Sequence, residues 1–468
     1  MNTTYEGTNK MIAGIVLGVI TFWLFAQSMV NVVPAIQTDL AISLNTLNIA
    51  ISLTALFSGM FVVAAGNLAD KIGRKKMTYI GLILNIVGSF LIVITTGPAL
   101  LISGRIIQGL SAACIMPSTI ALMSTYFVGA NRQRALSYWS IGSWGGSGVC
   151  SFAGGAIATT LGWQWIFVFS IICSVLSMIL LKDTPESKGT GEQTSKFDRA
   201  GLLLFAIMML GLNIFITKGA DFGWTSTSSI ALLTLTIVTA TLFIRIEWRK
   251  TNALIDFSLF KDKAYTAATV SNFLLNAVAG TLVISNLYVQ IGRGFSAFQA
   301  GLLSIGYLVS VLIMIRVGEK ILQHCGAKFP MLLGSAFTAV GISFMAFTFL
   351  PGIYYTIAVF VGFILFGTGL GMYATPSTDT AVCHAPEDKL GTASGVYKMA
   401  SSLGSSFGVA ISTAVYSMAY ASGQLNIAAT AGIATNLTFA VLAFITIAIS
   451  IPSRASVHNT EKMPSPLS

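Results

Sequence analysis

Long apolar stretches follow one another along almost the whole chain and are separated by short polar segments. A helix needs about 20 apolar residues to cross the core of a bilayer. By that measure the sequence predicts fourteen membrane-spanning helices, near 11–32, 46–66, 77–95, 99–123, 135–159, 163–182, 200–219, 228–247, 266–289, 297–317, 329–350, 353–380, 392–418 and 431–451. The stretches are about twice as long as a barrel strand and lack its period-two alternation. The predicted fold class is therefore an all-α polytopic membrane protein.

The polar interruptions divide the predicted helices into groups of six, two and six. The longest interruption, 182–199, follows the sixth helix, and a basic stretch, 245–263, precedes the ninth. Secondary transporters are commonly built from two related halves with the substrate site between them. The predicted domains are an N-terminal six-helix half, a cytoplasmic linker with two inserted helices, and a C-terminal six-helix half with a short cytoplasmic tail: residues 1–182, 183–263 and 264–468.

Composition and charge support a membrane protein and give its orientation. The chain is 54% hydrophobic and 9% charged, whereas a soluble domain carries about 25% charged residues. Cytoplasmic loops are enriched in Lys and Arg. With both termini in the cytoplasm, all but four of the 26 basic residues lie inside; the exceptions are Lys218, Arg293, Arg105 and Lys398. The net charge of +10 is thus a topology signal. The expected partner is the lipid bilayer, and a nucleic-acid partner is disfavoured.

The residues of enzymes and metal sites are sparse. The three histidines, His324, His384 and His458, share no metal-ligand spacing. None of the five cysteines falls in a predicted outer loop, and no Gly-rich loop ends in Gly-Lys-Ser or Gly-Lys-Thr. We therefore expect no metal, no cofactor and no catalytic residues.

The loop after the second predicted helix is the most specific segment of the chain. It reads Gly66-Asn67-Leu68-Ala69-Asp70-Lys71-Ile72-Gly73-Arg74-Lys75-Lys76. Gly66 would permit close contact between helices and Gly73 a tight turn. Asp70 can pair with a neighbouring arginine such as Arg74 or lie at a helix N-terminus, where negative charge is favoured. If the loop served only to anchor the chain on the cytoplasmic side, neither the glycines nor Asp70 would be needed. An ionic latch that stabilises one of two alternating states would account for both.

The fourth predicted helix contains a charged residue, in the run Gly104-Arg105-Ile106-Ile107-Gln108-Gly109-Leu110-Ser111-Ala112-Ala113. A charged side chain within the membrane is costly and usually marks a transport pathway or a proton relay. The alternative is that Arg105 extends to the outer interface.

The fifth predicted helix is rich in glycine: Gly142, Gly145, Gly146, Gly148, Gly154 and Gly155. Small residues let helices pack closely. A dynamic role and a static packing face explain this pattern equally well.

These segments resemble motifs A, B and C of the major facilitator superfamily. Across nearly its full length the chain resembles the 14-helix drug:proton antiporters of that superfamily, the QacA-like branch, and it looks particularly like the NorB/NorC-type quinolone and multidrug efflux pumps. Further matching segments are Phe197-Asp198-Arg199-Ala200-Gly201, Leu254-Ile255-Asp256-Phe257, Ser137-Tyr138-Trp139-Ser140-Ile141-Gly142 and Tyr373-Ala374-Thr375-Pro376-Ser377. The resemblance implies the major facilitator fold, location in a bacterial cytoplasmic membrane and export of varied drugs driven by protons. It also implies that Arg105 takes part in proton coupling.

Two departures from the family pattern affect these implications. Motif C lacks its usual proline, since the chain reads Cys150-Ser151-Phe152-Ala153-Gly154-Gly155. The family's aspartate in the first helix is replaced by Ala26. No carboxylate lies near the middle of a predicted helix, and Asp379 is the deepest. Proton coupling then depends on Asp70, on Asp379 or on another route. Asp379 either forms a structural pair with Lys398 or titrates.

The resemblance implies a substrate cavity lined by the first, fourth, ninth and twelfth helices. Its candidate binding residues are aromatic, amide and methionine side chains, which suit varied amphiphiles: Trp23, Gln27, Asn31, Gln108, Met116, Asn272, Asn276 and Tyr373. Each could instead serve helix packing. A pocket with Arg105 and no central carboxylate predicts a preference for zwitterionic, neutral or anionic drugs over dicationic biocides.

Three functions remain in competition. The leading one is proton-coupled multidrug efflux by alternating access, with drugs and protons as partners. A second is dedicated export of an endogenous metabolite, lipid or siderophore, and a third is a non-transporting receptor or scaffold. The oligomeric state is open, with a monomer as the working expectation.

Overall fold

Helices make up the regular structure of the described residues. The computed structural model describes residues 5–189, 198–250, 253–420 and 423–453. Its α-helices are α1 (Asn9–Asn31), α2 (Val33–Leu40), α3 (Leu44–Ile72), α4 (Arg74–Val93), α5 (Pro98–Tyr126), α6 (Gly129–Ser140), α7 (Gly146–Thr160), α8 (Gln164–Leu180), α9 (Arg199–Phe222), α10 (Thr227–Glu247), α11 (Lys263–Ala277), α12 (Ala279–Ile291), α13 (Ala297–Cys325), α14 (Lys328–Met345), α15 (Gly352–Cys383), α16 (Leu390–Tyr420) and α17 (Leu425–Ser450). A π-helical turn, Ile141–Gly145, joins α6 to α7, and two 3₁₀ turns, Phe257–Lys261 and Glu387–Lys389, precede α11 and α16.

Short polar residues and glycines set the ends of these helices. The side chain of Ser43 accepts a hydrogen bond from the N–H of Thr46 at the start of α3. Ser296 and Gln299 form a reciprocal capping box at the start of α13, which satisfies backbone donors that the helix itself cannot. Gly73 separates α3 from α4 with φ +127°, and Gly326 separates α13 from α14 with φ +80°. These are conformations that glycine adopts more readily than other residues.

Three features differ from the helices that we predicted from the sequence. The short helix α2 was not predicted. The fifth predicted span contains the π-helical turn, which coincides with Gly142 and Gly145. The ninth predicted span is two helices that meet at Val278. The amide of Asn276 donates to the backbone carbonyl of Asn272 at 2.8 Å, and such side-chain bonds compete with the helix ladder.

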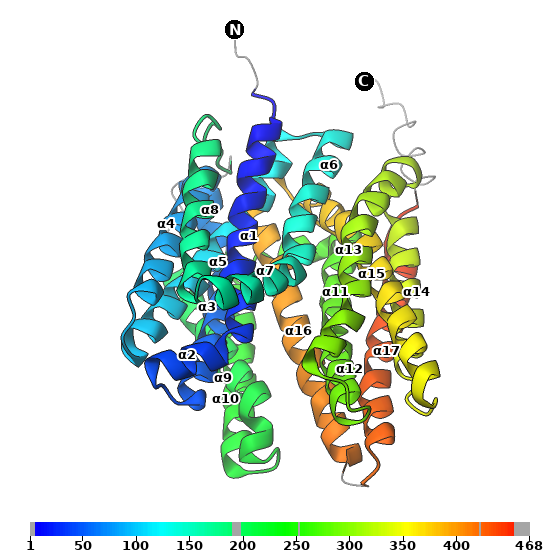
Figure 1. The fold of residues 1–468 in the computed structure, drawn as a ribbon. Coiled ribbons are helices and arrows are strands. Elements are labelled where there is room, and N and C mark those ends of the chain that lie inside the picture. The colour runs from blue at the N-terminus through cyan, green and yellow to red at the C-terminus, as the bar shows by residue number, and fades with distance from the viewer. Residues whose placement is uncertain (1–4, 190–197, 251–252, 421–422, 454–468) are drawn as a thin grey trace. The chain divides into compact units, whose positions relative to one another are not determined.

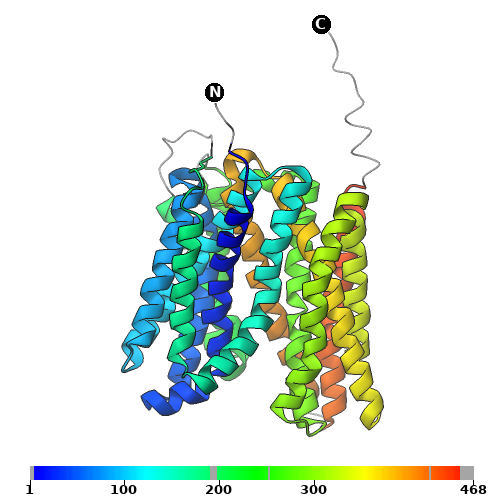
Figure 2. The ribbon, with the colours of Figure 1, turned by 45° about the horizontal axis from the view of Figure 1, so that its top comes forward.

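The chain folds into two compact units. Unit 1 contains Met1–Ser258 and Ala385–Met399, and unit 2 contains Leu259–His384 and Ala400–Ser468. In unit 1, α3 and α4 pack on α5, α1 packs on α7 and α8, and α9 packs on α10 and α3 (Figure 1; Figure 2). In unit 2, α13 and α14 pack on α15 in the same way that α3 and α4 pack on α5. The loops at Gly73 and Gly326 therefore occupy corresponding places, as expected for a repeated unit.

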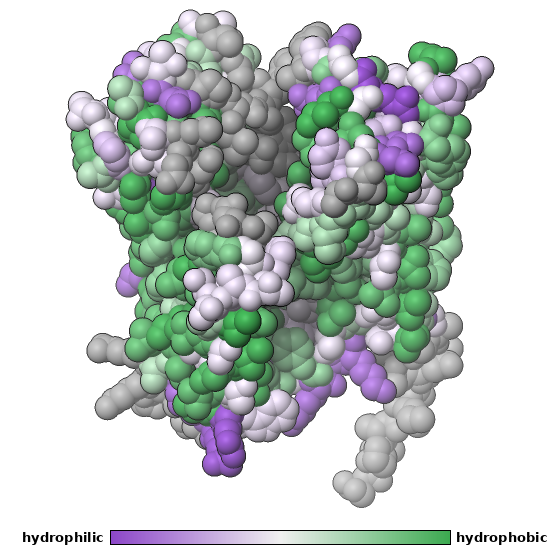
Figure 3. All heavy atoms as spheres, turned by 90° about the horizontal axis from the view of Figure 1, so that it is seen from below, coloured by the Kyte–Doolittle hydropathy of each residue, from purple (hydrophilic) through white to green (hydrophobic). Residues whose placement is uncertain are grey.

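The helices carry apolar side chains on their outer faces as well as between them. Ten helical segments of the described chain are long and apolar enough to cross a membrane. On the face shown in Figure 3, hydrophobic side chains cover much of the coloured surface and hydrophilic ones form small groups. In the apolar window of the α10 segment, only 22% of the residues are buried inside the protein. Such exposed apolar helices require a lipid environment, so the chain is a multi-pass membrane protein.

Candidate functional site

The segment 66–76, which we predicted to be a loop, is helical except at Gly73: it is the end of α3 and the start of α4. This junction forms a buried ionic cluster in unit 1. Asp70 and Arg74 pair at 3.0 Å, with side chains 8% and 2% exposed. The Asp70 carboxylate also accepts hydrogen bonds from the N–H groups of Gly391 and Thr392, both at 2.8 Å. These are the first backbone donors of α16, where a negative charge is favoured. Asp70 thus meets both kinds of partner that the sequence suggested, an arginine and a helix N-terminus.

Arg74 and the two glycines complete this cluster. Arg74 donates to the hydroxyl of Thr125 at 2.6 Å and to the backbone carbonyl of Glu387 at 2.7 Å. A Cβ atom on Gly66 would lie 2.2 Å from the carbonyl oxygen of Gly391, so the backbones of α3 and α16 meet directly at this point. The cluster ties the start of α16 to the end of α3 and the start of α4.

Glu186 is part of the same region and was not identified from the sequence. Its two carboxylate oxygens accept hydrogen bonds from the backbone N–H groups of Lys75 and Lys76, both at 2.9 Å. An acidic side chain at a helix N-terminus satisfies free donors and interacts favourably with the helix dipole. The polar segment 182–199 gave no signal for this contact because Glu186 lies more than one hundred residues from α4 in sequence.

Arg105 lies inside unit 1, on α5, and is only 1% exposed. Its Nη1 donates to the backbone carbonyl of Phe25 at 2.6 Å and to the side-chain oxygen of Gln108 at 2.9 Å. Within the described residues its Nε has no hydrogen-bond partner. The guanidinium therefore does not extend to an interface. A buried cation with a free donor is costly and is characteristic of a functional position.

A chain of buried polar side chains continues from Arg105 across three helices. Gln108 donates to the hydroxyl of Ser89 at 3.0 Å, and Ser89 donates to the side chain of Asn85 at 3.2 Å. Asn85 in turn donates to the hydroxyls of Ser170 and Ser174, at 2.9 and 2.7 Å. Arg105 and Gln108 were identified from the sequence, whereas Ser89, Asn85, Ser170 and Ser174 were not. Isolated Ser and Asn residues in apolar helices carry no distinctive spacing.

Two other predicted binding residues of unit 1 lie on α1 and α5. Trp23 is partly exposed, and its indole Nε1 has no hydrogen-bond partner in the described residues. A Cβ atom on Gly146 would lie 2.5 Å from the Trp23 ring, so the glycine-rich segment after the π-helical turn makes room for this indole. Met116 is 5% exposed. The side chains of Gln27 and Asn31 lie outside the described residues.

Lys398 lies in the part of α16 that belongs to unit 1. Its ammonium is 3.4 Å from the hydroxyl of Ser143 and 5.1 Å from the centre of the Trp139 ring. Trp139 is buried and its indole donates to Thr119 at 3.0 Å. An aromatic face stabilises a cation that has left water. Lys398 thus contacts the segment around the π-helical turn.

The remaining predicted residues lie in unit 2. Asn272 donates to the hydroxyl of Ser401 at 2.7 Å, and Asn276 donates to the side-chain oxygen of Asn272 at 2.9 Å. The Tyr373 hydroxyl lies 2.8 Å from that of Ser271. Both Asn272 and Tyr373 are fully buried.

Asp379 also belongs to unit 2 and is 4% exposed. Its place near the inner end of the twelfth predicted helix corresponds to α15, beyond Pro376, a proline inside the helix. The structural pair of Asp379 with Lys398, and the alternative that Asp379 titrates, both stay predictions.

Comparisons with known proteins identify the family. The sequence model of the family described as "Major Facilitator Superfamily" matches residues 15–409 of this chain. The chain is 58% identical over 451 residues to "Quinolone resistance protein NorB" of Staphylococcus aureus strain MRSA252, which covers 96% of this chain and 97% of that protein. The NorB protein of strain COL is 59% identical over 452 residues, with the same coverage.

Solved structures show the same fold at low sequence identity. The proton:xylose symporter XylE is 15% identical, with a TM-score of 0.66 and coverage of 95% of this chain and 96% of that one. The human organic anion transporter MFSD10 is 12% identical, with a TM-score of 0.63 and coverage of 94% and 98%. The match over most of the chain and the high identity to its relatives mean that this chain belongs to the major facilitator superfamily.

Proposed function

We propose that this protein is a proton-coupled multidrug efflux antiporter that exports amphiphilic drugs such as fluoroquinolones by alternating access, with biocides and dyes as further candidate substrates. The observation that carries the proposal is the 58% identity, over 96% of the chain, to a protein named for quinolone resistance. At that identity over the full length, the substrate class is expected to be shared.

The buried polar groups of each unit support a binding role. In unit 1, Arg105 and Trp23 each carry a donor without a partner in the described residues. A buried donor that lacks a partner costs about 1–3 kcal/mol, a cost that a bound substrate with acceptor groups would remove. We propose that these residues bind drugs together with Gln108, Met116, Gln27 and Asn31, and that Asn272, Asn276 and Tyr373 do so from unit 2.

Proton coupling and gating are assigned to charged residues. We infer that Asp70 and Arg74 form a latch that stabilises one of the alternating states, because breaking a buried pair is costly. Arg105 and Lys398 are cations inside or at the edge of the membrane, and Asp379 is the deepest predicted carboxylate. We propose that Asp379 or Asp70 carries the proton, and that Lys398 and Arg105 respond to its charge.

The helix lengths and the distribution of basic residues support a proposal for the topology. Ten segments satisfy the length and hydropathy of a membrane span. We propose four more: α6 with α7, α8, α9 and α16, which gives fourteen spans in a 6+2+6 arrangement. The domains are then 1–182, 183–263 and 264–468. Both termini would face the cytoplasm of a bacterial cell, in its cytoplasmic membrane, and the monomer is the expected unit.

Transport in proteoliposomes with an imposed proton gradient tests the proposal. We expect gradient-dependent movement of norfloxacin and of ethidium by the wild type, and its loss in Asp379→Asn if Asp379 carries the proton. Retained transport in the variant would move the proton site to Asp70. The absence of gradient-dependent transport of either compound by the wild type would contradict drug antiport.

A further inference from the structure

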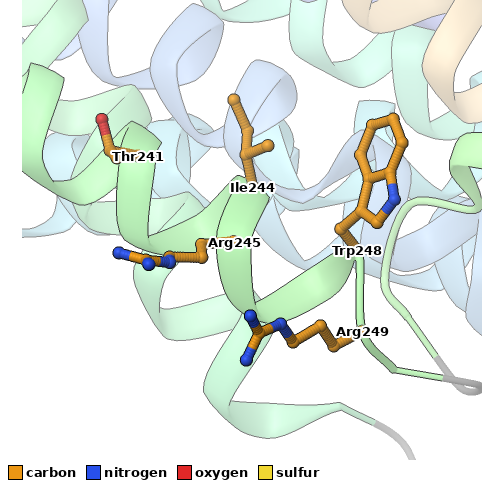
Figure 4. A pocket seen from close by; sticks show the side chains of 5 residues that line it. All are labelled: Thr241, Ile244, Arg245, Trp248 and Arg249. Atoms are coloured by element: carbon orange, nitrogen blue, oxygen red, sulfur yellow. The ribbon is translucent and has the colours of Figure 1, made fainter.

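The end of α10 carries a groove that the drug-transport site does not use. The groove has a volume of about 470 Å³ and is lined by Thr241, Ile244, Arg245, Trp248 and Arg249 (Figure 4). All five residues belong to unit 1. They follow the spacing of one helix face, since residues three or four apart are neighbours on a helix. The groove is therefore formed by α10 and the residues directly after it.

The helix that leads into the groove is apolar and exposed. Ile237 is 56% exposed and Ile244 48%. This row of apolar side chains faces outward over the membrane-spanning length of α10, where acyl chains are the expected neighbours. The groove thus lies where an apolar helix face meets the polar boundary of the bilayer.

The two arginines in the groove have no partner in the part of the chain that the structure describes. Arg245 and Arg249 are exposed, and among the described residues their guanidinium groups form no hydrogen bond or ion pair. Figure 4 shows both of them at the same end of α10. Lys250, the next residue, behaves differently, because it pairs with Asp198 and with Glu247.

The acidic groups that the structure describes nearby, Asp198 and Glu247, already have partners, so the two arginines give the groove a positive charge. Asp198 accepts from Lys250 and from the backbone N–H of Gly201. The buried carboxylate of Glu247 accepts from Lys250 and from the backbone N–H of Leu254. Neither carboxylate lines the groove. Since neither guanidinium group has a partner among the described residues, the pair would favour an anionic ligand at a membrane boundary.

Trp248 supplies the third element of the groove. Its indole is 70% exposed and stacks on Phe257, with ring centres 5.3 Å apart. An exposed tryptophan that is held in place is typical of the lipid headgroup region. An arginine fork matches a phosphate in two hydrogen bonds, and basic groups at the ends of membrane helices recognise anionic headgroups.

We propose that Arg245, Arg249 and Trp248 form a binding site for an anionic phospholipid, with the phosphodiester on the two guanidinium groups, the glycerol region against the indole and one acyl chain along Ile244 and Ile237. The ligand class is a phospholipid of net negative charge such as phosphatidylglycerol. With the orientation proposed above, the lipid belongs to the cytoplasmic leaflet.

Native mass spectrometry of the full chain, purified in detergent and titrated with phosphatidylglycerol or phosphatidylcholine, tests the site. We expect the wild type to prefer phosphatidylglycerol. The variant Arg245→Gln/Arg249→Gln should bind it about 25-fold more weakly, because each of the two basic residues at an anionic surface contributes roughly fivefold. The matched control is Lys261→Gln/Lys263→Gln, which removes two exposed basic residues elsewhere and should leave the affinity unchanged.

Several outcomes would overturn the proposal. Equal binding of the two lipids would do so, as would an equal loss in the control variant, which would indicate a general charge effect. Displacement of the lipid by an equal concentration of glycerol 1-phosphate would indicate a site for free phosphate esters.

A second measurement covers the case in which the double variant fails to fold. Brominated phosphatidylglycerol should quench the tryptophan fluorescence of the wild type more than that of Trp248→Phe. Equal fractional quenching in the two proteins would rule out a lipid at this groove.

Discussion

Arg105 allows a binding role to be separated from a structural one at the level of a single residue. In Arg105→Leu, two charge-assisted hydrogen bonds are lost, each worth about 1.5–3 kcal/mol, but the desolvation cost of a buried cation, several kcal/mol, also disappears. We therefore expect a stability change within about 2 kcal/mol, by thermal melting in detergent, together with loss of norfloxacin transport. Arg134→Leu, at an exposed position, is the control. A large drop in stability with transport retained would make Arg105 a structural residue.

Asp70 and Arg74 should be coupled energetically, because they share one buried ion pair. Removing one partner of such a pair costs about 3–5 kcal/mol, since the other charge is left buried. Asp70→Asn and Arg74→Gln should each destabilise the protein strongly, and the double variant should be less unstable than the sum predicts. We expect a coupling energy of about 2 kcal/mol from the four unfolding free energies. Simple additivity would mean that the loop is only an anchor for topology.

At the scale of elements, the contact of α3 with the start of α16 depends on glycine. A Cβ atom at Gly66 would lie 2.2 Å from the carbonyl oxygen of Gly391, and a backbone atom cannot rotate away. Gly66→Ala should therefore destabilise the protein by about 1–3 kcal/mol and lower the rate of transport. The matched control is Gly301→Ala in α13, where a Cβ atom meets nothing within 4 Å and alanine favours the helix by about 1 kcal/mol. Equal effects at the two glycines would count against a close-contact role for Gly66.

The segment between α10 and α11 is tied to the turn before α16 by an ion pair of Asp256 with Lys389. Burial raises the pKa of Asp256, but hydrogen bonds from Lys389 and Ser258 outweigh it and leave this pKa below the ordinary value of 3.8. A carboxyl group with a lowered folded pKa stabilises the protein above its unfolded pKa. The stability difference between wild type and Asp256→Asn should therefore be fully present at pH 7, begin to shrink near pH 4 and be lost as the pH falls through the lowered pKa of the folded state. Melting temperatures measured from pH 7 downwards check this, and a difference that does not shrink below pH 4 would contradict it.

The elements also show how far the sequence can predict this fold and this site. Runs of apolar residues locate the long helices because crossing a membrane demands length and hydropathy, which are local properties. Gly73 and Asp70 could be predicted because a loop motif combines a turn residue with a charge. The chain from Gln108 to Asn85 and Ser170 could not be, since the partners lie on different helices and only packing brings them together. The π-helical turn after Ser140 escapes prediction for a related reason: one extra residue in a helix hardly changes its apolar pattern.

At the scale of the whole molecule, the repeat relates distant parts of the chain. Gly73 and Gly326 each turn the chain with positive φ between a pair of helices that pack on a third. The second copy keeps an ion pair, between Arg316 and Glu319. At the first junction the carboxylate of the ion pair also accepts from the N-terminus of α16. The repeat therefore accounts for the shared architecture, and the latch proposed at Asp70 adds this contact within unit 1.

The 6+2+6 arrangement can be tested by asking whether the two inserted helices, α9 and α10, cross the membrane. If α9 and α10 both cross the membrane, the turn between them faces outward while residues before α9 face the cytoplasm. In a variant without the native cysteines, Thr225→Cys should react with a membrane-impermeant maleimide on intact cells, as should Thr96→Cys between α4 and α5. Lys188→Cys should react only after the cells are permeabilised. All three positions are exposed, so burial cannot explain a difference between them. Labelling of Thr96→Cys without Thr225→Cys on intact cells would place the inserted helices on the cytoplasmic side and reduce the number of spans to twelve.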